Sequence, residues 1–119
     1  MNADQIAEIR PALREAIDGA PHCCVTFEVE ADPERWLQVV DHTINAAYPH
    51  ADDPEPRLKT LPGVSGIRIT GWETQKFVTL ELSEWDLGSL GEWIDAYFVS
   101  VLACEAGDYH VDITCETLK

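Results

Sequence analysis

Apolar residues recur at three- and four-residue steps between Asp86 and Glu105, the longest stretch of helical periodicity in the chain. A stripe this wide covers about half of a helix circumference, and it predicts a helix packed against the core. Asp86 is placed to cap the N-terminus of this helix, and Gly107 to end it. The stripe consists of Leu87, Leu90, Ile94, Tyr97, Phe98, Val101 and Leu102, with Trp93 and Cys104 beside it.

The back of this predicted helix carries little charge, and two interpretations stay open. Alanine is a good helix former, so this side can simply face water. Its small uncharged residues would also let another helix approach closely, either the N-terminal helix or that of a second copy in a homodimer. The candidate dimer surface consists of Ala96, Val99, Ser100 and Ala103.

Alternating apolar and polar residues predict strands in four further segments. In residues 22–30, Val25, Phe27 and Val29 alternate with polar positions. Two more predicted strands, GIRITGW and KFVTLELS, are joined by a short turn. The last is YHVDITCETL near the C-terminus.

Residues 33–48 fit either a helix or a hairpin. As a helix, Asp32 caps and Pro33 takes the first position. As a hairpin, RWLQVV and INAAYP are two strands around the reversal D-H-T. The β-branched residues and the poor helix formers in this segment favour the hairpin.

Two shorter helices complete the prediction. Residues 3–18 carry an apolar line that Pro11 interrupts. Asp53 followed by Pro54 predicts a short helix that runs to Leu61 and turns Leu58 and Leu61 inward.

These elements predict one α+β domain over residues 1–119, because the length suits a single core. The hairpin interpretation gives the order α-β-β-β-α-β-β-α plus a final strand, with an antiparallel sheet and helices packed on one face. The helix interpretation gives a ferredoxin-like βαββαβ arrangement with an extra N-terminal helix.

In the hairpin interpretation, a helix is followed by CVTFEVE, RWLQVV and INAAYP, a short helix, two strands and a long aliphatic helix. This order resembles that of type III secretion chaperones and the related YbjN-like peptide-binding proteins over nearly the whole chain. The resemblance implies a peptide-binding, chaperone-like function and a homodimer. The strand YHVDITCETL is an addition to that order.

Acidic residues dominate the charge, with 22 against 8 basic residues and a net charge of −14. Such a chain repels nucleic acid phosphates, so we expect no nucleic acid partner and a basic protein or peptide instead. No apolar run approaches the length of a membrane span, and the N-terminus does not resemble a secretion signal. We therefore expect a cytoplasmic protein without a membrane partner.

The residues of catalysis and metal binding form no recognisable pattern. Cys23, Cys24, Cys104 and Cys115 have no zinc spacing and are expected to be free thiols. His22 and His110 could lie near Cys24, but nothing marks this cysteine as activated. We expect no enzyme activity, no metal and no cofactor.

The outward face of the sheet is the candidate working surface. If the first and last strands are neighbours, their carboxylates crowd together, and like charges opposed across a sheet cost stability. Two tryptophans near strand ends, Trp72 and Trp85, are candidate anchors for a partner. The acidic candidates are Glu28, Glu30, Asp112 and Glu116.

Two functions fit these observations. The first is a non-catalytic, chaperone-like acidic module that holds a partner protein or peptide. The second is an immunity or inhibitor protein that blocks a basic toxin or nuclease by presenting carboxylates.

Overall fold

The computed structural model describes residues 11, 14, 23–30, 32–40, 43–61, 67–82, 87–104 and 111–117. The strands are β1 (Cys23–Val29), β2 (Asp32–Val40), β3 (Thr43–Ala47), β4 (Ile67–Glu73), β5 (Phe77–Leu82) and β6 (Val111–Thr117), and the helices are α2 (Pro54–Lys59) and α3 (Leu87–Ser100). Of the helix predicted over residues 3–18, only Pro11 and Arg14 are described, and both are helical and exposed. The rest of that prediction lies outside the described residues.

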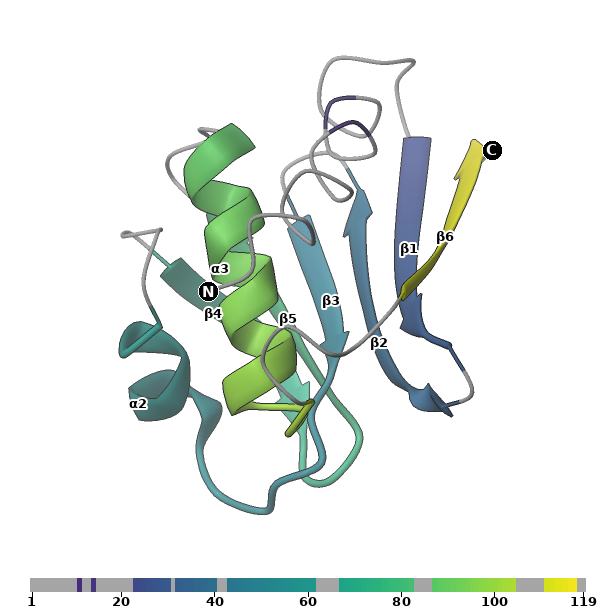
Figure 1. Ribbon diagram of the computed structural model, residues 1–119. Helices are drawn as coiled ribbons and strands as arrows, with labels where there is room; N and C mark the ends of the chain where they lie inside the picture. Colours follow the sequence, from purple (N-terminus) through teal and green to yellow (C-terminus); the bar gives the residue numbers. More distant parts are fainter. Residues whose placement is uncertain are drawn as a thin grey trace.

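The six strands form one antiparallel sheet in the order β4-β5-β3-β2-β1-β6 (Figure 1). Neighbours in sequence form the pairs β1–β2, β2–β3 and β4–β5. Two other pairs, β3–β5 and β1–β6, join segments that are far apart in the chain. The predicted α+β class and its single antiparallel sheet are confirmed.

Within residues 33–48, the described positions 33–40 and 43–47 belong to strands β2 and β3, so the hairpin interpretation is correct. Leu37 lies opposite Ala46, and Val39 lies opposite Ile44, which puts these four side chains on the buried face. The helix interpretation and the ferredoxin-like arrangement are wrong. The β-branched side chains here pack well on a pleated surface, whereas in a helix they would lose rotamer freedom.

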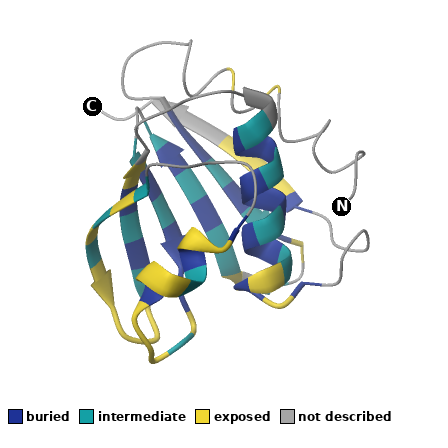
Figure 2. Ribbon diagram, turned by 90° about the vertical axis from the view of Figure 1, so that its left-hand side faces the viewer, coloured by how far each residue is buried: buried dark blue, intermediate teal, exposed yellow. Residues whose placement is uncertain are grey.

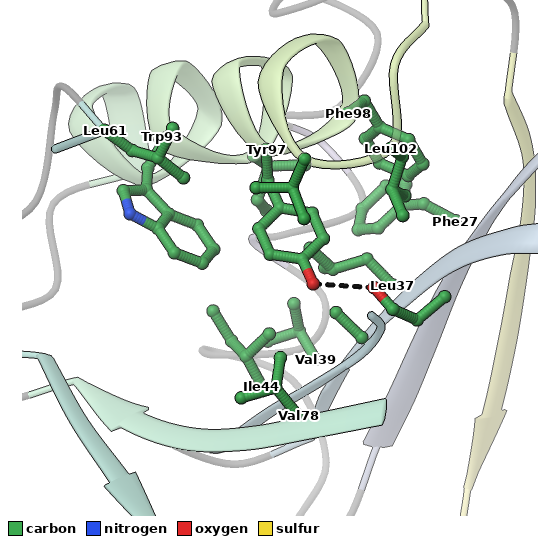
Figure 3. Packing of buried hydrophobic residues seen from close by; sticks show 14 of the residues in the cluster. Phe27, Leu37, Val39, Ile44, Leu61, Val78, Trp93, Tyr97, Phe98 and Leu102 are labelled. Atoms are coloured by element: carbon green, nitrogen blue, oxygen red, sulfur yellow. Dashed lines mark hydrogen bonds between the residues drawn. The ribbon is translucent and has the colours of Figure 1, made fainter. Parts of the chain in front are cut away.

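The core lies between one face of the sheet and the two helices. Buried residues alternate with half-buried ones along the strands (Figure 2), as expected for a sheet with one face against the core. Aromatic side chains of α3 point toward the sheet (Figure 3), and Leu58 of α2 belongs to the same buried cluster. The largest completely buried side chains are Trp93, Tyr48, Tyr97, Phe27 and Phe98.

The long helix ends earlier than the sequence predicts. The periodicity continues through Val101 and Leu102, but α3 stops at Ser100, so the stop predicted at Gly107 is wrong. Ala103 takes a left-handed conformation with φ of 59°, and the Cys104 N–H donates to the Phe98 carbonyl at 2.9 Å. This bond, which joins residues six positions apart, satisfies a carbonyl of the last turn. Val101 and Leu102 follow the end of the helix, and their side chains are still buried in the core.

The short helix α2 begins as predicted but ends at Lys59, two residues before the predicted end at Leu61. The Asp53 carboxylate accepts the N–H of Glu55 at 2.9 Å, and Pro54 follows directly. Proline suits this position because its missing N–H would have no partner there. Leu58 and Leu61 are buried, as expected. Among the described residues, neither helix has the length and apolarity needed to cross a bilayer.

Candidate functional site

One face of the sheet has no helix over it among the described residues (Figures 1 and 2), and we call it the outer face. Its strand positions alternate with those that enter the core, so they can be assigned from the register. On β1 these positions include Thr26 and Glu28, and on β2 they include Trp36 and Gln38. Glu28, Trp36 and Gln38 are each half-buried, and Trp36 also packs against the core cluster.

Two acidic residues lie directly opposite each other on the outer face. Because β1 pairs with β6, Glu28 is opposite Asp112. Side chains in such positions have Cβ atoms about 4.5–5.5 Å apart, and like charges there are destabilising. No cation among the described residues forms an ion pair with either carboxylate. Among the described residues, this edge of the outer face therefore carries negative charge without a paired cation.

The other two acidic candidates flank this pair. Glu30 follows β1 in a turn and is exposed. The register places Glu116 opposite Cys24, two positions beyond the row of Thr26 and Thr114. The prediction required the first and last strands to be neighbours. β1 and β6 do pair, and their register brings Glu28 and Asp112 together.

An uncharged polar row crosses the middle of the outer face. Thr26 pairs with Thr114 on one side and with Gln38 on the other, and Gln38 pairs with Asn45. Asn45 accepts a hydrogen bond of 2.6 Å from the Thr79 hydroxyl on β5. These hydroxyl and amide groups can donate to a partner or accept from it.

At the opposite edge of the sheet, acidic residues are balanced. Arg68 on β4 lies opposite Glu81 on β5, and its guanidinium donates to the carboxylate at 2.8 Å. Lys76 lies 3.2 Å from Glu73 across the β4–β5 turn. The uncompensated charge of the described strands is thus concentrated at the β1–β6 edge.

Trp72 lies on the other face of the sheet, away from the acidic pair. The register of β4 shifts between Ile69 and Gly71, so Thr70 is an extra residue and the alternation reverses. Trp72 consequently pairs with the buried Val78 on the helix side. It is 39% exposed and contacts Tyr48 edge-on, with ring centroids 6.2 Å apart. Trp85, the second predicted anchor, lies outside the described residues.

An open hollow lies beside Trp72, between α2 and β4, the last strand at this end of the described sheet. It has a volume of about 360 Å³, and we call it the Trp72 hollow. Its lining combines apolar side chains of β4 with two carboxylates from the start of α2. The lining residues are Asp53, Glu55, Ile67, Arg68, Ile69, Thr70, Gly71 and Trp72.

Polar contacts hold the loop between β3 and α2. Arg57 donates to the Asp52 carboxylate at 3.0 Å, and the Tyr48 hydroxyl lies 3.4 Å from the same group. The hydrogen bond from Arg57 lowers the pKa of Asp52. Burial raises the pKa of Tyr48. His50 Nε2 lies 2.8 Å from the Val101 carbonyl, so this loop is connected to the end of α3.

The candidate dimer surface is only partly available. Ala96 and Val99 are half-buried and pack against the core, whereas Ser100 and Ala103 are exposed. Ala103 lies beyond the end of α3, so it is not on the back of the helix as predicted. Its left-handed conformation, rather than helix packing, explains its position.

The two cysteines whose side chains are described, Cys24 and Cys104, are buried, and they form no disulfide bond. Arg35 donates a long contact of 3.9 Å to the Cys104 sulfur, yet burial outweighs this cation and raises the pKa of the thiol. A raised pKa lowers the thiolate fraction and the reactivity. Within the described part of the chain, no three metal-binding side chains gather. His22 and His110 lie outside that part.

Sequence reasoning missed a charged cluster at the end of the core. Asp95 on α3 is only 3% exposed, and Arg35 on β2 lies 3.1 Å from Asp32. The charges of all three residues act on Cys104. The sequence does contain one indication of this cluster. Arg35 is two residues from the buried Leu37 on the same strand, so both side chains are on the core face.

No family model, curated protein or solved structure matches this chain.

Proposed function

We propose that this chain is a non-catalytic, chaperone-like module that holds a basic protein or peptide on the outer face of its sheet. The opposition of Glu28 and Asp112 carries this proposal. Both carboxylates lack a described cation, so the free protein keeps a repulsion that a basic partner would relieve.

The surroundings of the acidic pair suit a protein partner. Trp36 lies opposite Glu28 on the side away from Asp112, and it adds a large half-buried aromatic surface. Aromatic side chains are enriched among residues that dominate binding energy. The polar row of Thr26, Gln38 and Asn45 supplies hydrogen-bonding groups in the adjacent position. A basic segment crossing β6, β1 and β2 would thus meet charge, aromatic surface and hydrogen bonds.

A cytoplasmic location is part of this proposal. The buried Cys104, which forms no disulfide bond, supports it, because thiols persist in a reducing compartment.

The net charge of −14 favours a second candidate of a different kind, an immunity or inhibitor protein that neutralises a basic toxin or nuclease. Here the same carboxylates would occupy the place of nucleic acid phosphates. Salt distinguishes the two functions. Charge-steered inhibition loses association rate steeply as salt rises, whereas holding a client through mixed apolar and polar contacts depends on salt less strongly.

The test compares immobilised wild-type protein with the double variant Glu28→Gln/Asp112→Asn in a native lysate, followed by binding kinetics with each purified partner. We expect a partner retained by the wild type to be lost from this variant. The matched control is Glu73→Gln/Glu92→Gln, which removes the same charge at the β4 edge of the sheet and on α3, and should retain the partner. Equal retention by the two double variants would refute recognition at the acidic pair.

A further inference from the structure

We infer that the Trp72 hollow binds an arginine side chain of the basic partner. This inference rests on the proposed function and adds a second contact on the opposite face of the sheet. It begins from the exposure of Trp72, which with Ile113 is one of the two large apolar side chains exposed among the described residues.

On the β4 side, the hollow is lined by apolar side chains that other residues hold in place. Ile67 and Ile69 are half-buried and pack against the core. Trp72 is supported edge-on by Tyr48, whose side chain is completely buried, at an interplanar angle of 83°. This contact holds the indole in place, while 39% of the residue stays exposed. The methylene groups of a long side chain can pack against these apolar side chains.

On the α2 side, the hollow is lined by two acidic residues. Asp53 and Glu55 are both exposed at the start of α2. Asp53 accepts the N–H of Glu55 through one carboxylate oxygen, and Glu55 lies 2.9 Å from Lys59. Each carboxylate has a second oxygen with room for a further donor. Arg68 also lines the hollow, but its guanidinium is paired with Glu81 at 2.8 Å.

Arginine fits this combination better than other occupants. Its planar guanidinium stacks on aromatic faces and donates to carboxylates in a fixed geometry. Addition of a partner strand to the edge of β4 is disfavoured, because the bulge at Thr70 interrupts regular pairing. A second copy of this chain is disfavoured by its own charge of −14.

The experiment follows the indole N–H signal of Trp72 by NMR, assigned with Trp72→Phe, during titration with acetyl-Gly-Arg-Gly-amide. The same peptide with citrulline has nearly the same shape without the charge. We expect a saturable shift of the Trp72 signal with the arginine peptide and none with the citrulline peptide. Equal shifts with both peptides, or no saturable shift with arginine, would overturn the inference.

Three variants localise the effect. Asp53→Asn removes the charge but keeps a good helix cap, and Glu55→Gln removes the other carboxylate. Each should weaken arginine binding roughly two- to fivefold, the size expected for one exposed electrostatic contact. Glu34→Gln, an equal charge change away from the hollow, should leave the affinity unchanged, and an equal loss there would also overturn the inference.

Failure of the arginine contact can be distinguished from failure of the proposed function. A partner that is lost with Glu28→Gln/Asp112→Asn but binds Trp72→Phe and Asp53→Asn normally would refute the arginine contact alone. Saturable arginine binding together with an unaffected partner in Glu28→Gln/Asp112→Asn would support the hollow and refute the acidic pair.

Discussion

The Tyr97 hydroxyl donates a hydrogen bond of 2.6 Å to the backbone carbonyl of Ala47, across the buried interface between α3 and β3 (Figure 3). Both residues are almost completely buried, so water cannot replace either partner. This bond fixes the position of the helix over the centre of the sheet.

Tyr97→Phe should therefore lower the free energy of unfolding. The substitution keeps the ring and removes the donor, which costs about 1–3 kcal/mol for a buried group. Urea denaturation followed by circular dichroism measures the change. Tyr48→Phe is the matched control, because its hydroxyl makes a longer contact of 3.4 Å to the exposed Asp52. A loss in Tyr48→Phe as large as that in Tyr97→Phe would contradict this explanation.

Stability should fall in alkaline solution. Burial raises the pKa of Tyr97, Tyr48 and Cys104. A group whose pKa is raised by folding stays protonated in the native state, while the unfolded chain releases its proton at the ordinary value. The stabilisation is then complete below the unfolded pKa, about 8.5 for cysteine and about 10 for tyrosine, and is lost as the pH rises through the folded pKa.

The pH dependence can be assigned to Tyr97 by comparison with Tyr97→Phe. Each group that ionises only in the unfolded chain contributes a slope of about 1.4 kcal/mol per pH unit. The difference in unfolding free energy between wild type and variant should narrow above about pH 10, because only the wild type loses this contribution. A constant difference up to the alkaline unfolding limit would show that Tyr97 does not titrate this way.

Ala103→Gly should stabilise the protein. Ala103 has a φ of 59°, and a left-handed conformation costs an L-residue about 1–2 kcal/mol. Glycine removes this cost but adds about 0.4–1 kcal/mol of chain entropy in the unfolded state. The expected net gain is about 0.5 kcal/mol, measured by urea denaturation. Ala96→Gly within α3 is the control and should destabilise by about 1 kcal/mol.

Neutralising one member of the acidic pair should also stabilise the free protein. Glu28→Gln or Asp112→Asn removes a like-charge repulsion across β1 and β6, worth about 0.2–1 kcal/mol. The second substitution should add little once the first is present, which a double-mutant cycle measures. The gain should shrink at high salt. Glu81→Gln, which removes the partner of Arg68, should give no gain.

Local patterns predicted most of the elements but not their long-range arrangement. Alternation identified β1, β4, β5 and β6, and β-branched residues such as Val39 favoured the correct hairpin. The pairing of β1 with β6 joins distant segments, and nothing local distinguishes Glu28 as the partner of Asp112. From the sequence alone, the crowding of these carboxylates follows only if the two strands are neighbours.

The remaining errors arise where tertiary contacts override periodicity. Val101 and Leu102 continue the helical spacing but are buried after α3 has ended. The bulge at Thr70 moves Trp72 to the helix side, which strict alternation does not predict. Asp95 is buried on a helix face where the apolar pattern does not lead one to expect a charge.

The position of β1 between β2 and β6 has a consequence for synthesis on the ribosome. β2 follows β1 at once, whereas β6 is the last of the described strands to be translated. Until it emerges, one edge of β1 has no neighbour among these strands, and an open edge is a template for aggregation. Glu28 is the second-to-last residue of that edge strand. Its charge would discourage other nascent chains from pairing there before the native strand arrives.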